Sequence, residues 1–368
     1  MSGDSSKPKG KRKTKTAPKA MSAAQYLKTL RSMKGVDPES YALFSDPLAA
    51  ISPVKEWLST GCIGIDKLTG GGWPVGRIVE VAAWEGVGKT TLLDQSIAAA
   101  QQQGAVCVLI DSERARSLTY TETLGVDIDS LIVSRADTLE QGFDAIDRLL
   151  AIQEAEMERL RKSGSEAPPI LFIWDSIVVD TEAEHEQSAH DNNQPALAAR
   201  TIKRNLKKFV QRFADARATL VFSNHFYSGI GPFSSLNTYG GGAVKYYTSL
   251  RLWLKRVGKL DVGNKTVGHI VEAKLKKTKV CQPREPEQVG LIYGAGLHNA
   301  YSLFAWGKKA KNSDGKPFIQ SAGSWLSLTT PDGEVLRWQK TFMGFAEILA
   351  EHPELYKQLA DLYWNSDA

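Results

Sequence analysis

Features typical of exported, disulfide-linked or membrane-spanning proteins are scarce in this 368-residue sequence. The three cysteines, Cys62, Cys107 and Cys281, are odd in number and widely spaced, which supports neither a disulfide framework nor a zinc site. No apolar stretch reaches the roughly 18 residues that a membrane-spanning helix needs. Basic residues begin the chain without an apolar segment behind them, which argues against a secretory signal. We therefore expect a cytoplasmic protein with no membrane partner.

The net excess of positive charge lies at one end of the chain. The formal net charge is +5, yet residues 1–20 alone contain seven basic residues and one acidic residue, so the remainder is close to neutral. This tail is rich in Lys, Ser, Pro and Gly and has no large apolar side chain after Met1, so we expect it to be disordered. It is either a solvated extension or a loose electrostatic anchor on nucleic acid.

The rest of the chain divides into three parts. Residues 21–58 contain an amphipathic helix, expected over 23–33, which must dock on its own core or on a neighbouring subunit. Residues 59–298 alternate strands and helices, which predicts an α/β core with a mostly parallel twisted sheet flanked by helices. Residues 299–368 are interpreted as a small separate α+β domain. Strands are predicted at 78–82, 105–110, 170–174, 219–223 and 249–256, and helices at 90–103, 139–162 and 197–217.

One segment of the core carries a phosphate-binding pattern. It lies between a predicted strand and a predicted helix, and it matches G-x-x-x-x-G-K-[ST] except for alanine at the first glycine. In such a P-loop, backbone N–H groups surround a phosphate at the helix N-terminus, the lysine neutralises phosphate charge, and the hydroxyl residue holds Mg²⁺. The residues of this predicted nucleotide site are Ala83, Trp84, Glu85, Gly86, Val87, Gly88, Lys89, Thr90 and Thr91.

Acidic residues follow two of the predicted strands. Asp111 and Glu113 follow one strand, and Asp175 follows another. In a P-loop enzyme an aspartate in this place binds Mg²⁺ through water, and a glutamate polarises the attacking water. The alternative is that these acids only cap turns, but a P-loop in the same sheet favours the catalytic interpretation. His225, after a third strand, is placed to touch a γ-phosphate, although a lone histidine is more often structural.

These segments together resemble the RecA-type recombinases. The resemblance runs through STG (59–61), GIDKLTGGGWPVGRIVEVA (64–82), EGVGKTTLLDQSIAAAQQQG (85–104), DSE (111–113), LGVDIDSL (124–131), WDSIV (174–178), LAAR (197–200), GGGAVKYYTSLRL (240–252) and LIYGAGL (291–297). It extends more weakly through AGSWL (322–326) and LAEHPE (349–354). It implies a RecA-like ATPase core, an N-terminal oligomerisation segment, a small C-terminal domain, and ATP and Mg²⁺ as cofactors.

The resemblance also implies roles around the nucleotide. Glu113 resembles the glutamate that activates water for ATP hydrolysis, and Glu85 matches the acid inside the family's P-loop. Tyr120 lies where the family stacks a tyrosine on adenine. His225 occupies the position of the glutamine that senses the γ-phosphate, and histidine can also donate to a phosphate oxygen, with a charge that depends on pH near neutrality. Together with Lys89, Glu113 and His225 form the expected catalytic set.

Two further sets of nucleotide ligands are implied. Thr90 and, through water, Asp175 would hold Mg²⁺. Lys277 and Lys279 match the lysine pair that reaches a neighbouring subunit's ATP, which would couple hydrolysis to filament assembly. From the residues alone, the basic run at 274–279 could be only a solvated basic face, but the spacing and the family position favour the functional interpretation.

Two polar segments, 184–194 and 226–242, are either ordinary surface loops or, by the resemblance, the loops that hold DNA along the axis of a filament. Ile230 would then insert between bases. Such contacts avoid base edges, which suits a protein that accepts any sequence. The remaining expected DNA contacts are Arg200, Lys203, Lys207, Gly240, Gly241, Gly242, Ala243 and Lys245.

Several positions depart from the family pattern. Ala83 replaces a P-loop glycine, His225 replaces the sensing glutamine, and Pro195 stands where the family usually has a methionine that inserts between bases. The stretch 137–175 is longer than usual, the C-terminus lacks a strongly acidic tail, and the basic N-terminal tail has no counterpart. These traits indicate a divergent bacterial or bacteriophage branch.

The sequence therefore predicts a DNA-dependent ATPase that forms helical filaments on single-stranded DNA. It would pair this DNA with a homologous duplex and exchange strands, in DNA repair and the response to DNA damage. One alternative is a nucleotide-binding, filament-forming mediator with weak or lost hydrolysis, which Ala83 and His225 could support. A RecA-fold motor such as a replicative helicase is disfavoured, because the second loop and KKTKV match recombinases.

Overall fold

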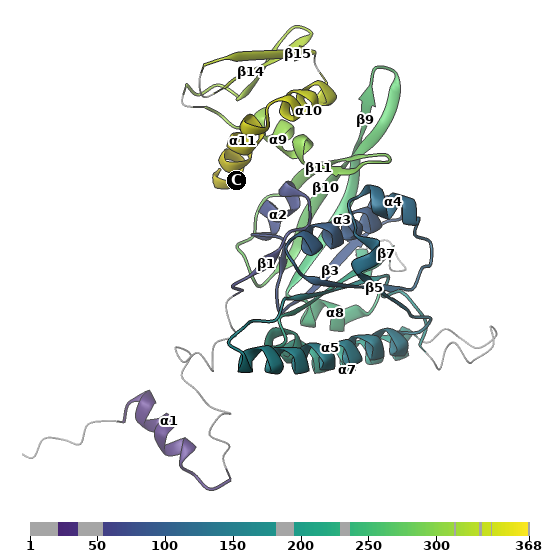
Figure 1. Cartoon of the computed structure of the whole chain (residues 1–368), viewed down its shortest axis with the longest axis vertical. Coiled ribbons are helices and arrows are strands. Elements are labelled where there is room, and N and C mark those ends of the chain that lie inside the picture. Colours follow the sequence, from purple (N-terminus) through teal and green to yellow (C-terminus); the bar gives the residue numbers. More distant parts are fainter. Residues whose placement is uncertain are drawn as a thin grey trace, which may run out of the picture. The chain divides into compact units, whose positions relative to one another are not determined.

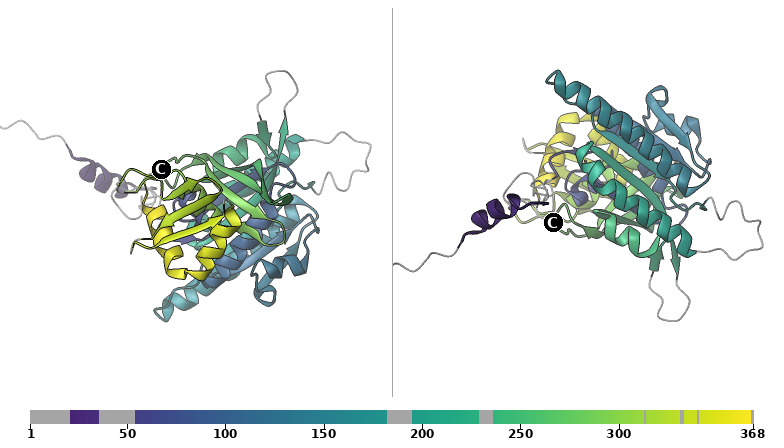
Figure 2. Two further views of the ribbon diagram at one scale, coloured as in Figure 1. Left: turned by 90° about the horizontal axis from the view of Figure 1, so that it is seen from above. Right: turned by 90° about the horizontal axis from the view of Figure 1, so that it is seen from below.

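The computed structural model in Figures 1 and 2 describes residues 21–35, 54–181, 195–228, 236–312, 314–330, 333–339 and 341–366. The chain divides between Pro53 and Val54 into two compact units. The predicted basic tail, the predicted DNA loop at 184–194 and Ile230 lie outside the described residues.

The described part of the first unit contains one helix, α1 (Ala23–Arg31). Ser22 caps it reciprocally with Gln25: the Gln25 N–H donates to Ser22 Oγ over 3.4 Å, and the Ser22 N–H donates to Gln25 Oε1 over 2.7 Å. The helix ends two residues before the predicted boundary, because the Ser32 hydroxyl turns back to the Thr29 carbonyl oxygen over 2.7 Å. None of the helix residues is buried within this unit.

The second unit is built on a ten-stranded sheet in the order β12-β11-β10-β9-β3-β7-β6-β4-β5, with β8 paired to β7. The run from β9 to β5 is parallel throughout, which confirms the predicted mostly parallel sheet. The strands are β3 (Ile78–Ala83), β4 (Val106–Asp111), β5 (Leu131–Arg135), β6 (Ile170–Asp175), β7 (Ala218–Ser228), β8 (Leu236–Thr238), β9 (Leu250–Val262), β10 (Lys265–Thr278), β11 (Glu287–Ile292) and β12 (Gly296–His298).

The antiparallel half of the sheet differs from the prediction. The strand expected to end at residue 256 continues to Val262 and returns as β10, and β11 and β12 extend the same edge. Alternation of strands and helices predicts only parallel neighbours, so it misses a hairpin without an intervening helix. The difference matters because β10 and β11 contribute one wall of the cavity described below.

Helices cover both faces of the sheet (Figure 1). The helices α2 (Ile63–Thr69) and α3 (Lys89–Gln102) share one core with the sheet, while α5 (Leu139–Lys162), α7 (Pro195–Asp215) and α8 (Gly241–Tyr247) share the other. The helices α5 and α7 lie side by side, as Figure 2 also shows. Gly142 brings α5 against the sheet, because a Cβ there would overlap the Trp174 ring. Phe143 then packs edge-to-face on Trp174, with ring centroids 4.9 Å apart.

The C-terminal part contributes most of a third core cluster, which also includes Leu260 of β9. Its helices and strands are consistent with the predicted α+β composition. It comprises α9 (Asn299–Gly307), β13 (Ile319–Ala322), β14 (Trp325–Thr329), β15 (Val335–Gln339), α10 (Phe342–Glu351) and α11 (Pro353–Asn365), with the three strands antiparallel. Lys67 links α2 to the end of α11: its Nζ donates to the Tyr363 carbonyl oxygen over 2.6 Å. Among the described residues, no helix combines the length and apolarity needed to cross a membrane.

Candidate nucleotide-binding site and its flanking loops

The phosphate-binding segment leaves a buried strand and enters a helix, as the pattern predicts. Gly86 and Gly88 have φ of 67° and 112°, so glycine is required by conformation at these two positions. Ala83 is the last residue of β3, is fully buried and pairs with His225 in parallel register. It is not among the described residues with positive φ, and alanine therefore fits at the first position of the pattern.

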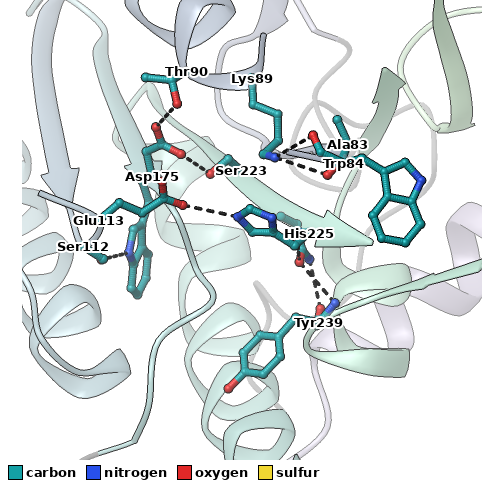
Figure 3. Close-up of polar contacts among 12 residues, drawn as sticks. Ala83, Trp84, Lys89, Thr90, Ser112, Glu113, Asp175, Ser223, His225 and Tyr239 are labelled. Carbon is teal, nitrogen blue, oxygen red and sulfur yellow. Dashed lines mark hydrogen bonds and ion pairs between the residues drawn. The ribbon is translucent and has the colours of Figure 1, made fainter. Parts of the chain in front are cut away.

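Lys89 begins α3 and points back toward the end of β3. Its Nζ donates to the carbonyl oxygens of Ala83 and Trp84 over 3.2 and 3.3 Å (Figure 3). Burial lowers the pKa of the ammonium group, while Asp175 and Glu113 oppose that shift. An ammonium group partly removed from water beside the free N–H groups of a helix N-terminus is suited to bind an anion.

Asp175, at the end of β6, gathers three donors. Thr90 Oγ1 donates to Oδ2 over 2.8 Å, and the Ser223 hydroxyl donates to Oδ1 (Figure 3). Arg116 Nη2 also donates to Oδ2, over 3.0 Å. Because the Thr90 proton is directed to the carboxylate, the lone pairs of its hydroxyl oxygen remain available to a cation. A hydroxyl and a carboxylate are oxygen ligands of the kind that Mg²⁺ prefers, so the donor set fits this ion. Among the described residues no group of three or more His, Cys, Asp or Glu forms an all-protein metal cage.

Glu113 and His225 meet across the carboxyl ends of β4 and β7. His225 Nε2 lies 3.3 Å from Glu113 Oε1. This contact is the main cause that lowers the pKa of Glu113; Ser176 and Lys89 act in the same direction, and burial opposes them. Glu113 is thus poised as an ionised carboxylate beside Lys89.

Asn224 connects His225 with the far end of the predicted second DNA loop. Its Oδ1 accepts hydrogen bonds from the backbone N–H groups of His225 and Tyr239 over 2.8 and 3.1 Å. Its Nδ2 donates to Glu80 Oε1 over 2.9 Å, and Glu80 is fully buried and paired with Arg251. Both ends of the 226–242 segment are therefore attached to a buried polar network next to the phosphate site.

A cavity of about 400 Å³ brings most of the predicted nucleotide residues together. Its lining includes the predicted residues Glu85, Gly86, Gly88, Lys89, Thr90, Thr91, Glu113, Tyr120 and His225. Four lining residues were not predicted: His269, Leu291, Tyr293 and Gly294. His269 and Leu291 belong to β10 and β11, and Tyr293 and Gly294 lie in the turn between β11 and β12. The segment LIYGAGL (291–297) was itself a signal for three of them.

Trp84 and Val87 do not line this cavity. Half of the Trp84 side chain is exposed, and its ring packs edge-to-face on Phe226 with centroids 5.8 Å apart. Val87 is buried in the core, and its carbonyl oxygen lies 3.1 Å from His269 Nε2.

Lys277 and Lys279, at the end of β10, also lie apart from the cavity of their own chain. Lys277 Nζ donates to the carbonyl oxygens of Lys245, Tyr246 and Thr248, the last over 2.7 Å. Lys279 Nζ donates to the Tyr246 carbonyl oxygen over 3.0 Å. Burial, with the nearby Lys279, lowers the pKa of Lys277 to about 8. We call α8 together with Lys277 and Lys279 the α8 edge.

Two rows of cations run along α7 and differ in their partners. Lys208 and Arg212 form ion pairs with Asp147 of α5, and Arg212 also pairs with Glu154. The predicted DNA-contact residues of this helix form the other row, with successive positions three and four residues apart on one face. They are exposed, and among the described residues they have no carboxylate partner: Arg200, Lys203 and Lys207.

The remaining described DNA-contact candidates lie on α8. Gly240 is its N-cap, with φ of 81°, and residues 241–243 form its first turn, where backbone N–H groups lack helical acceptors. Lys245 is exposed, and its Nζ donates to Asn237 Oδ1 over 3.1 Å.

Comparison with known proteins identifies relatives along most of the chain. Residues 50–298 match the family model of the RecA N-terminal domain. The chain is 34% identical over 307 residues to Protein RecA of Colwellia psychrerythraea, which covers 83% of this chain and 82% of that protein. It is 33% identical over 312 residues to Protein RecA of Thermotoga neapolitana, with 84% and 83% covered. Protein RecA of Thermotoga maritima is 32% identical over 308 residues, with 83% and 81% covered.

Proposed function

Since the chain belongs to the RecA family of recombinases, we propose that it is a DNA-dependent ATPase that forms helical filaments on single-stranded DNA. In such a filament it would pair the bound strand with homologous double-stranded DNA and exchange strands during recombinational repair. The observation that carries the proposal is the convergence of Lys89, Thr90 and Glu113 on one cavity at the carboxyl edge of the sheet.

In this proposal each residue of the cavity has a chemical task. The Lys89 ammonium and the N–H groups of the P-loop bind the phosphates of ATP. Glu113, which its lowered pKa keeps ionised, polarises the attacking water. Tyr120 stacks on the adenine. Thr90 and, through water, Asp175 would hold Mg²⁺, and the ion would neutralise phosphate charge.

The contacts of His225 support a link between nucleotide and DNA. His225 lines the cavity, and its backbone N–H is bound to Asn224, which also holds Tyr239 at the end of the second loop. A γ-phosphate that binds His225 would therefore move a residue that is connected through Asn224 to the end of the second loop. We propose that DNA lies against this loop, including Ile230, and against the unpaired row of α7 and the first turn of α8.

The α8 edge supports a site completed between subunits. Lys277 and Lys279 do not line their own chain's cavity, and their ammonium groups lie on the surface formed by α8. We propose that both lysines reach the phosphates bound by a neighbouring chain.

One contact favours a second candidate, a filament-forming mediator with weak hydrolysis. His225 engages the Glu113 carboxylate, which would compete with an attacking water. Phosphate release measured with and without single-stranded DNA separates the two functions. The proposed ATPase releases phosphate faster with DNA and loses this release in Glu113→Gln. A chain that binds nucleotide and DNA but releases phosphate no faster than Glu113→Gln would be a mediator.

A further inference from the structure

Arg116 lies between β4 and α4 (Leu118–Thr123), and its side chain is turned inward rather than toward solvent. The side chain is 9% exposed and forms two ion pairs: Nε with Asp94 Oδ1 over 2.9 Å, and Nη2 with Asp175 Oδ2 over 3.0 Å. Asp94 belongs to α3 and is itself fixed by the Thr121 hydroxyl, which donates to its Oδ2 over 2.9 Å. One guanidinium group therefore balances two buried carboxylates.

The sequence carried one overlooked signal for this cluster. Asp94 lies three residues after Thr91 and three before Ile97, on the face of α3 that is buried in the core. A carboxylate on the buried face of a helix needs a cationic partner, because an unpaired buried charge is strongly destabilising. The partner is Arg116, three residues beyond Glu113.

The contact with Asp175 has a consequence beyond packing. Asp175 Oδ2 accepts hydrogen bonds from Arg116 and from Thr90, and Thr90 and Asp175 are the two residues that would hold Mg²⁺ in the proposed site. A guanidinium charge held against this oxygen reduces the attraction of the carboxylate for a second cation, and little water is present to screen the effect. The same hydrogen bond fixes the orientation of the carboxylate toward Thr90.

We propose that Arg116 is a positioning residue that acts through Asp175 and sets the Mg²⁺ concentration at which this chain binds nucleotide. The inference rests on the proposed function, because it requires Mg²⁺ and ATP at this cavity. Asp94 is part of the same arrangement. Its carboxylate partly neutralises the Arg116 guanidinium and so determines how strongly that positive charge acts on Asp175.

The test is a binding titration with the full chain, without DNA. A fluorescent, non-hydrolysable ATP analogue is bound at increasing free Mg²⁺, and its affinity is also measured in EDTA. In Arg116→Leu/Asp94→Leu the pair is replaced by apolar side chains, and we expect the half-saturating Mg²⁺ to fall by about threefold to tenfold. In Asp94→Asn, Arg116 acts on Asp175 alone, and the half-saturating Mg²⁺ should rise by a similar factor. Affinity in EDTA should change little in both.

Thr121→Val is the matched control, because it removes a hydrogen bond to Asp94 without changing any charge, and its Mg²⁺ midpoint should equal that of the unmodified chain. If the Mg²⁺ midpoints of Arg116→Leu/Asp94→Leu and Asp94→Asn do not shift, or shift in the same direction, the ion pair only stabilises the fold. If the double variant does not fold, Asp94→Asn decides alone: a rise supports the inference, and no change or a fall overturns it. If the unmodified chain binds the analogue equally well in Mg²⁺ and in EDTA, the proposed Mg²⁺ site fails as well.

Discussion

The phosphate site and the α8 edge use their lysines in opposite ways. Lys89 lies within the cavity, near the carboxylates of Glu113 and Asp175, beside backbone N–H groups that face the same space. Lys277 and Lys279 lie outside that cavity and donate to backbone carbonyl oxygens of the helix α8 and its end. One region places its lysine in a cavity with two nearby carboxylates, whereas the other holds its lysines against the carbonyl oxygens of a helix outside that cavity.

The difference indicates how binding and turnover are divided. In the proposed function, one chain holds the nucleotide in its own cavity, so binding should not require a second copy. The described residues of the cavity include no lysine or arginine besides Lys89, which fits the proposal that further positive charge at the phosphates comes from another copy of the chain. Hydrolysis would then depend on assembly.

The largest expected effect comes from the phosphate site. Lys89→Ala removes the only cation that lines the described cavity, so we expect nucleotide binding to weaken by about a hundredfold or more and phosphate release to disappear. Lys259→Ala, which removes an exposed lysine of β9, is the control and should bind normally. Equilibrium binding of a fluorescent ATP analogue measures the effect. Normal phosphate release by Lys89→Ala would refute the assignment of the cavity.

A second substitution separates binding from turnover. Lys277→Ala should leave binding by the isolated chain within about twofold, yet lower DNA-stimulated phosphate release by at least about tenfold. Lys276→Ala is the matched control, because the Lys276 ammonium lies 4.7 Å from the Trp253 ring instead of on α8. Thermal unfolding of both variants reports any loss of the α8 contacts. Hydrolysis at the normal rate by Lys277→Ala on DNA would disprove completion by a neighbour.

The two rows of α7 give a comparison within one helix. Lys203→Ala/Lys207→Ala should reduce the slope of log affinity against log salt for single-stranded DNA by about 1.4, since each lost phosphate contact contributes about 0.7. Lys208→Ala, taken from the row paired with α5, should leave the slope unchanged. Fluorescence anisotropy of labelled DNA at several salt concentrations measures both. Equal salt slopes for Lys203→Ala/Lys207→Ala and Lys208→Ala would show that single-stranded DNA does not contact Lys203 and Lys207.

The smallest expected effect is a dependence on pH. Because the pKa of Lys277 is lowered to about 8, its ammonium group is charged below this pH and neutral above it. DNA-stimulated hydrolysis should therefore fall as pH rises from about 7 to about 9, over which the charged fraction drops about tenfold. Lys279→Ala removes a nearby charge and should move the fall to higher pH. Nucleotide binding by the isolated chain, followed over the same range, should show no such midpoint.

The sequence predicted the parts of this structure that depend on local pattern. The buried strands β3 and β6, the helix α5 with its bounds and the P-loop follow directly from apolar runs, periodicity and glycine spacing. Ala83 illustrates the limit, because only the strand register with His225 shows that this position lies in regular strand conformation.

The long-range contacts could not be predicted in the same way. The antiparallel wall of the cavity depends on the pairing of β9 with β10, which are joined by a hairpin and lie beyond the alternating pattern. The cluster of Arg116, Asp94 and Asp175 joins three elements that are brought together only by the sheet order. The spacing of residues along the chain carries no information about such contacts. A charged residue on the otherwise apolar face of a helix, such as Asp94, does, because it predicts a buried partner of opposite charge.

The most direct test of the account is a high-resolution electron microscopy map of the chain on single-stranded DNA with a non-hydrolysable ATP analogue. The account predicts an extended helical filament in which the ammonium groups of Lys277 and Lys279 lie within hydrogen-bonding distance of the γ-phosphate held by the neighbouring chain's Lys89. Isolated rings would contradict it, as would a filament in which both lysines remain on the carbonyl oxygens of α8 and no neighbouring residue touches the nucleotide.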